Sequence, residues 1–283
     1  VAASLSLLAP DSKQVDEVLS RMTEWAPEHL RRSRFAETLV QTLLRPDSNE
    51  GRVSLRPDPV AEHLILKVFG EKPELLDDML PLDPLEVPGL EGPDVDESAV
   101  QRALAWGQQA QNTCMIITRA ASLDVQAASR LARRALKARP HLWSSALDVA
   151  LTQGGPFATA LEELIASGAD LPLAEIQDAI PLGHGALRGA ALAATKRLAA
   201  SAEQNPEHRA LWANTLANRL SDVGERDQAL EVAREAANLY RALTELSPTD
   251  YTPNLAGSLN NLANRLSDVG ERDQALGAAR EAV

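Results

Sequence analysis

The chain has 283 residues, of which 45% are hydrophobic, 24% are charged and only 3% are aromatic, and its net charge is −12. This balance is typical of a globular protein and argues against bulk disorder, while the scarcity of aromatic and β-branched residues favours helices. No apolar run reaches the roughly 20 residues that a membrane span needs, and the single cysteine, Cys114, excludes an internal disulfide and a cysteine-cluster zinc site. We therefore expect a cytoplasmic protein with no membrane attachment.

The first 72 residues combine helical patterns with a candidate hairpin. Helices are predicted over 2–9, 12–25, 27–37 and 60–69. Two short runs, 38–45 and 52–56, flank a turn signal at 47–51, and this arrangement is typical of a β-hairpin. Helices together with a hairpin predict a small winged-helix-like unit over 1–72.

A short acidic stretch follows and supplies three quarters of the net charge. Residues 71–97 hold ten acidic side chains and one basic side chain. The stretch is also interrupted by Pro73, Pro81, Pro84, Pro88 and Pro93. Such sequence is typical of an extended linker, which we place at 73–96. The negative total disfavours nucleic acid as a partner, because contacts to phosphates need positive potential.

The next block, 97–205, is predicted to be helical throughout. Proline and glycine divide it into helices at 97–110, 112–121, 124–138, 140–151, 156–167, 173–180 and 186–203. Five basic residues gather in the third of these helices: Arg130, Arg133, Arg134, Lys137 and Arg139. They are consistent with phosphate contact, but a solvated face or pairing with the acidic stretch is the favoured interpretation. Cys114 lies in an apolar segment and is expected to be a buried structural thiol rather than a nucleophile.

An internal duplication dominates the last 78 residues. Residues 217–236 and 263–282 match at 18 of 20 positions, with a spacing of 46. Each copy predicts two helices, because apolar residues recur every three or four positions on both sides of a glycine, Gly224 or Gly270. The second helix of the first copy ends at Ser247-Pro248, and Pro253 is expected in the first turn of the helix that follows.

The duplicated unit resembles the tetratricopeptide repeat. Its signature positions are matched by Leu216, Ala217, Leu220, Gly224, Ala229, Ala233 and Ala236, and in the second copy by Leu262, Ala263, Leu266, Gly270, Ala275, Ala279 and Ala282. The 46-residue period and the late Pro248 resemble the long-helix variant of kinesin light chains and of many bacterial proteins. The resemblance implies an all-α, right-handed helical solenoid over 206–283. Because the pattern still continues at Val283, we expect the array to be truncated there and the chain to be a piece of a longer protein.

The order of the segments resembles the C-terminal half of bacterial STAND-type signalling NTPases. The run LRPDPVAEHL at 55–64, followed by a helical block and repeats, carries this resemblance. It implies a ligand-sensing arm that follows a P-loop NTPase core. The chain itself has no G-x-x-x-x-G-K-[ST] loop, so we expect no enzymatic activity and no cofactor in it. Its five histidines lack metal-ligand spacing, and His184, between two glycines, is expected in a loop.

Polar residues repeat along the first helix of each copy. Asn214, Asn218 and Asp222 are spaced i, i+4, i+8 and share one helix face, and Asn260, Asn264 and Asp268 repeat the pattern. In tetratricopeptide repeats these positions line the groove that binds peptides, and an asparagine amide can both donate to and accept from a peptide backbone. Faithful duplication of idle surface residues is the alternative.

These observations predict a non-catalytic interaction scaffold. We expect a protein or peptide ligand in the groove, together with self-association through the truncated array. A winged-helix DNA-binding regulator with a repeat arm is the alternative. It is disfavoured because residues 1–70 hold 9 basic and 10 acidic side chains rather than a basic excess.

Overall fold

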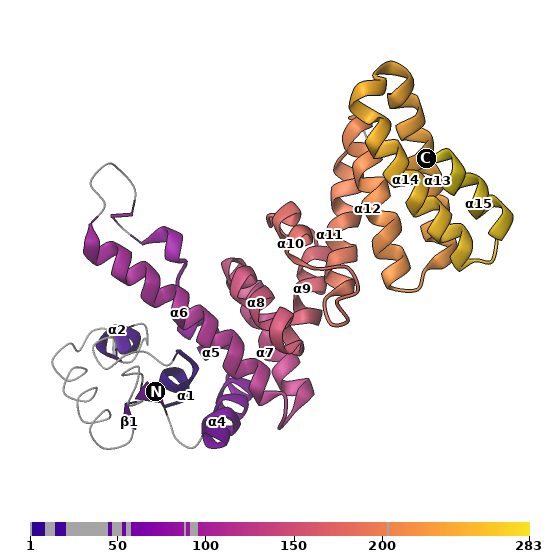
Figure 1. Ribbon diagram of the computed structural model, residues 1–283. Coiled ribbons are helices and arrows are strands. Elements are labelled where there is room, and N and C mark those ends of the chain that lie inside the picture. The colour runs from indigo at the N-terminus through magenta and orange to yellow at the C-terminus, as the bar shows by residue number, and fades with distance from the viewer. Residues whose placement is uncertain are drawn as a thin grey trace. The chain divides into compact units, whose positions relative to one another are not determined.

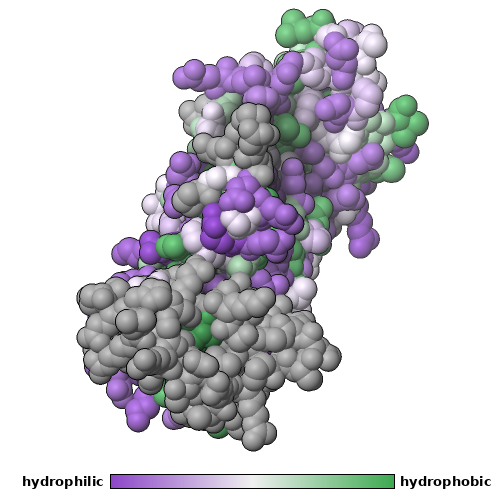
Figure 2. All heavy atoms as spheres, turned by 90° about the vertical axis from the view of Figure 1, so that its left-hand side faces the viewer, coloured by the Kyte–Doolittle hydropathy of each residue, from purple (hydrophilic) through white to green (hydrophobic). Residues whose placement is uncertain are grey.

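The computed structural model describes residues 2–8, 15–20, 45–46, 53–54, 58–87, 89–90, 96–202 and 204–283. Within these ranges the regular secondary structure is helical apart from one two-residue antiparallel ladder, as the sequence predicted (Figure 1). The chain divides into two compact units, Val1–Leu164 and Ile165–Val283. None of the described helices combines the length and apolarity of a membrane span. The face shown in Figure 2 is mainly hydrophilic over the described residues.

The first unit is built around the long helix α6. Its elements are α1 (Ala2–Leu8), α2 (Val15–Ser20), β1 (Arg45–Pro46), β2 (Val53–Ser54), α4 (Asp58–Glu71), α5 (Glu74–Met79), a 3-10 turn (Pro84–Glu86), α6 (Glu97–Ala120), α7 (Val125–Ala138), a second 3-10 turn (Pro140–Leu142), α8 (Trp143–Gln153) and α9 (Pro156–Ala166). Asp96 caps the N-terminus of helix α6, because its carboxylate accepts the N–H of Ser98. It contacts α1, α4, α7 and α8, and Asn112 on it donates to the carbonyl oxygen of Leu8 at 3.2 Å.

The N-terminal segment only partly matches the winged-helix prediction. Arg45 pairs with Ser54 and Pro46 with Val53, at the place where a hairpin was predicted. The turn at 47–51 and the helix predicted at 27–37 lie outside the described residues, and the residues that are described show no winged-helix unit. Helix α1 buries Leu5, Leu7 and Leu8 and contacts α4 and α6. It therefore shares a core with the helical block, across the boundary that we had expected at residue 72.

The acidic stretch is folded over 74–87 and differs from the extended linker that its composition suggested. Leu76, Met79 and Leu80 are buried, because α5 packs against α7. Arg134 of α7 donates to both carboxylate oxygens of Asp77, at 2.8 and 2.5 Å. Three apolar side chains and one bidentate ion pair thus hold a segment whose prolines and charges had pointed to a linker.

The second unit consists of helices that pack in chain order. They are α10 (Leu173–Ala179), α11 (Arg188–Ser201), α12 (Pro206–Asp222), α13 (Arg226–Leu246), α14 (Pro248–Asp268) and α15 (Arg272–Glu281). Each contacts the next, and α12 also contacts α14 (Figure 1). Leucine and alanine side chains fill the shared core, including Leu230, Leu259, Leu262 and Leu266. The small alanines let neighbouring helices approach closely, as expected for a stack of helical pairs.

The duplicated turns have the same geometry in both copies. Gly224 has φ +86° and Gly270 has φ +87°, a left-handed conformation that glycine adopts without steric cost. The N–H of Glu225 bonds to the carbonyl of Leu220, and the N–H of Glu271 bonds to that of Leu266, both at 2.9 Å. The predicted helix ends are therefore confirmed.

The start of α14 corrects one detail of the sequence analysis. The helix begins at Pro248, so Pro253 lies inside it rather than in its first turn. Pro248 suits the first helical position because its missing N–H would have no helical acceptor there. Pro253 is exposed, so its ring meets solvent on the outer side of the helix.

Candidate functional site

The six predicted groove residues lie on α12 and α14, in two different environments. The row on α12, Asn214, Asn218 and Asp222, is half-buried. The row on α14, Asn260, Asn264 and Asp268, is exposed. An identical sequence pattern thus has different neighbours in each copy, and the residues need to be considered one by one.

Asn214 connects the two rows. Its side-chain carbonyl oxygen accepts a hydrogen bond from the amide nitrogen of Asn261, at 3.1 Å. This bond joins α12 to α14 and gives Asn214 a structural role. Asn261 was missed by the sequence analysis because Thr215 holds the equivalent position in the first copy, so that comparing the copies gave no signal.

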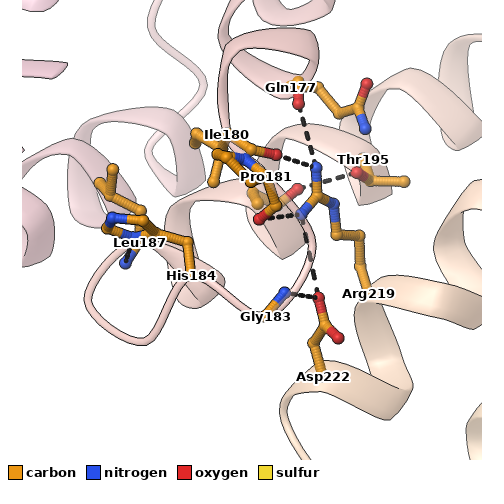
Figure 3. A network of polar contacts seen from close by, with 10 residues as sticks. Gln177, Ile180, Pro181, Gly183, His184, Leu187, Thr195, Arg219 and Asp222 are labelled. Atoms are coloured by element: carbon orange, nitrogen blue, oxygen red, sulfur yellow. Dashed lines mark hydrogen bonds and ion pairs between the residues drawn. The ribbon is translucent and has the colours of Figure 1, made fainter. Parts of the chain in front are cut away.

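Asp222 is engaged by the chain itself. Its carboxylate accepts the backbone N–H of Gly183 at 3.1 Å and lies 3.9 Å from a guanidinium nitrogen of Arg219 (Figure 3). Gly183 belongs to the loop between α10 and α11 and has φ +76°. His184 lies in this loop, as predicted, where its ring nitrogen Nδ1 accepts the N–H of Leu187 at 3.3 Å.

Arg219 anchors the same loop from the other side. It is buried, with 3% of its side chain exposed, and it donates to three backbone carbonyls. Nη1 bonds to the oxygen of Pro181 at 3.1 Å, and Nη2 to those of Gln177 and Ile180 at 3.0 and 2.6 Å (Figure 3). Burial lowers the pKa of Arg219 and the nearby charges of Asp222 and Asp178 oppose this, but a guanidinium stays protonated in proteins. No sequence pattern predicts this anchor, since a charged residue in an amphipathic helix is ordinarily solvated.

Three side-chain amides remain available for binding. The side chains of Asn218, Asn260 and Asn264 have no hydrogen-bond partner among the described residues. Their amide atoms are also absent from the buried polar atoms that lack a partner, so these atoms can reach solvent. They share a helix face with the Asp residues of their rows. An amide that is already solvated can exchange water for peptide groups with little desolvation cost.

The other candidates from the sequence are the basic residues of α7 and Cys114, and among them Arg133, Arg134 and Cys114 are paired or buried within the fold. In the basic helix α7, Arg134 pairs with Asp77 of the acidic stretch, as one of the weighed interpretations expected, and Arg133 pairs with Glu163 at 3.0 Å. Cys114 is buried, and that burial raises the pKa of its thiol, which keeps it protonated and unreactive.

Comparison with known families agrees with the repeat geometry. Residues 209–245 and 255–283 match the family model of the tetratricopeptide repeat. The C-terminal region of the chain therefore carries tetratricopeptide repeats, a class of module that binds proteins and peptides. Among curated proteins, no sequence matches the chain significantly.

Proposed function

We propose that the chain is a non-catalytic protein-interaction module that binds a peptide segment of a partner along α12 and α14. One observation carries the proposal. The first helices of the two repeats, α12 and α14, contact each other and present three amides without a partner among the described residues, those of Asn218, Asn260 and Asn264. In tetratricopeptide repeats these positions line the binding groove. A backbone presents alternating donors and acceptors, which an asparagine amide can match.

A more specific role follows from segment order alone. The chain is proposed as the sensor arm of a STAND-type regulator, in which ligand binding to the repeats would be relayed to an NTPase core. The acidic balance of the chain disfavours the alternative of a DNA-binding regulator. This role requires a P-loop NTPase core in the same polypeptide, and reading the gene upstream of the codon for Val1 tests whether one is encoded there.

The binding role is tested with peptides selected from a random 12-residue phage library on the full chain. Selected peptides should lose at least tenfold in affinity for the Asn218→Ala, Asn260→Ala, Asn264→Ala triple variant. The reason is that each lost hydrogen bond contributes about 0.5–1.5 kcal/mol, and about 1.4 kcal/mol is a factor of ten.

Asn254→Ala is the matched control. Asn254 is an exposed asparagine of the same helix α14 with no partner among the described residues, and it lies six residues before Asn260, outside the i, i+4 spacing of the amide row. Its replacement should leave the affinity unchanged. Equal binding by the triple variant and the wild type would show that the amide row is not the binding surface.

A further inference from the structure

The first repeat contains a built binding site for protein backbone. Arg219 and Asp222 together make four hydrogen bonds to main-chain groups between Gln177 and Gly183: three to carbonyls and one to an N–H. No side chain of that segment takes part in these four bonds (Figure 3). We refer to the Arg219–Asp222 pair as the backbone clamp.

The second repeat carries the same pair, and no main-chain segment of the described residues bonds to its side chains. Arg265 and Asp268 stand 46 positions further on, and their partner among the described residues is each other, at 3.4 Å. The exposed fraction of the side chain rises from 3% at Arg219 to 15% at Arg265, and from 21% at Asp222 to 40% at Asp268. The carboxylate also lies closer to its arginine than the 3.9 Å of the first repeat, as expected where no external N–H competes for it.

The difference follows from the helix that precedes each pair. Helix α10 ends at Ala179, and the irregular segment after it offers carbonyls to Arg219. The corresponding helix before α14 is α12, which closes its own end: Gly224 donates to Ser221 and Glu225 donates to Leu220. The carbonyls of Leu220 and Ser221 thus bond to N–H groups of their own turn, and Arg265 has no backbone acceptor among the described residues.

We propose that Arg265 and Asp268 form a second backbone clamp, which binds a partner protein where a helix of the partner ends in a turn of the Ile-Pro-Leu-Gly type. The last carbonyls of a helix have no intrahelical donors and attract cations, so the forked donors of an arginine fit them. The carboxylate then accepts the N–H of a residue with positive φ, which favours glycine, as at Gly183.

This inference rests on the proposed function and adds the ligand class. Asp268 lies on the same helix face as Asn260 and Asn264, at spacings of eight and four residues. A partner segment held by the clamp can therefore continue along the exposed amides. Recognition uses the partner's backbone conformation and requires no charged side chain from it.

The test uses the chain's own clamped segment as the probe. A fluorescent peptide of residues 173–187 is titrated into the full chain. We expect saturable binding that Arg265→Lys and Asp268→Ala each weaken at least tenfold. The lysine variant keeps the charge but loses the forked donors. Asp273→Asn, which removes an exposed carboxylate at the start of the next helix α15, should bind as the wild type does.

The peptide itself supplies a second criterion. A version with valine in place of Gly183 should not bind, because a β-branched residue disfavours positive φ. No saturable binding, or binding that both Arg265→Lys and Asp268→Ala retain, overturns the clamp. If the peptide fails while library-selected peptides still depend on the amide row, the clamp is wrong and the proposed function stands. If both fail, the proposed function is wrong as well.

Discussion

Arg219 and Arg265 show how strongly the surroundings of a residue decide its role. Both lie in the same run of matching sequence, ANRLSDVGERDQAL. Arg219 is buried and bonded to three carbonyls, whereas Asp268 is the one polar partner of the Arg265 side chain among the described residues. Burying a guanidinium is costly unless it is hydrogen-bonded, and both terminal nitrogens of Arg219 are bonded to carbonyls. In the first copy the arginine therefore holds a loop of the fold, whereas in the second copy it has no such structural contact to main-chain groups among the described residues.

Replacing each arginine by methionine should separate these roles. Arg219→Met leaves three carbonyls without donors, and we expect it to lower the free energy of unfolding of the second unit by about 3 kcal/mol, because hydrogen bonds to charged groups contribute about 1.5–3 kcal/mol each and are not additive. Arg265→Met should cost less than about 1 kcal/mol, since it breaks one partly exposed ion pair. Both losses in the free energy of unfolding can be measured by urea denaturation, with hydrogen exchange of the amides in 226–246 as the readout. Equal losses would mean that Arg265 is also a structural anchor.

At the scale of elements, the duplicated helix pair was the most predictable part of the molecule. Apolar periodicity and two glycines with positive φ determine where its helices end, and both signals are local. The acidic stretch was less predictable, because α5 depends on Leu76 and Met79 meeting α7, a contact that composition does not reveal. The loop at 180–187 was predicted, but its attachment to Arg219 was not, since that anchor lies about forty residues away in the sequence.

Two glycine substitutions in the second copy should act in opposite directions. Gly270 has φ +87° and Gly257 lies inside α14, and a Cβ would have no neighbour within 4 Å at either position. Gly270→Ala should therefore destabilise by about 1–2 kcal/mol through backbone strain alone. Gly257→Ala should stabilise by about 0.5–1 kcal/mol, because alanine loses less entropy in a helix. Thermal unfolding of the two variants measures the difference, and a shift of the same sign in both would contradict the assigned conformations.

At the scale of the whole molecule, the chain contains two cores. Ile117 is buried in the first unit, and Leu259 is buried in the second, between helices of the repeat pair. The sequence had suggested four segments, because composition changes sharply at the acidic stretch. The structure instead places helices from three of those segments within the first unit, since α1, α5 and α7 all contribute to its packing.

Separate cores should unfold separately, because compact units with their own buried side chains can lose structure independently. Leu259→Ala should lower the stability of the second unit by about 2–5 kcal/mol, the usual cost of removing a buried leucine side chain. Hydrogen exchange should then accelerate across 206–268 and stay unchanged across 97–153. Ile117→Ala should give the reverse pattern. If either substitution instead accelerates exchange equally in both ranges, the chain unfolds as one cooperative body, and a ligand bound at the repeats would stabilise the first unit as much as the second.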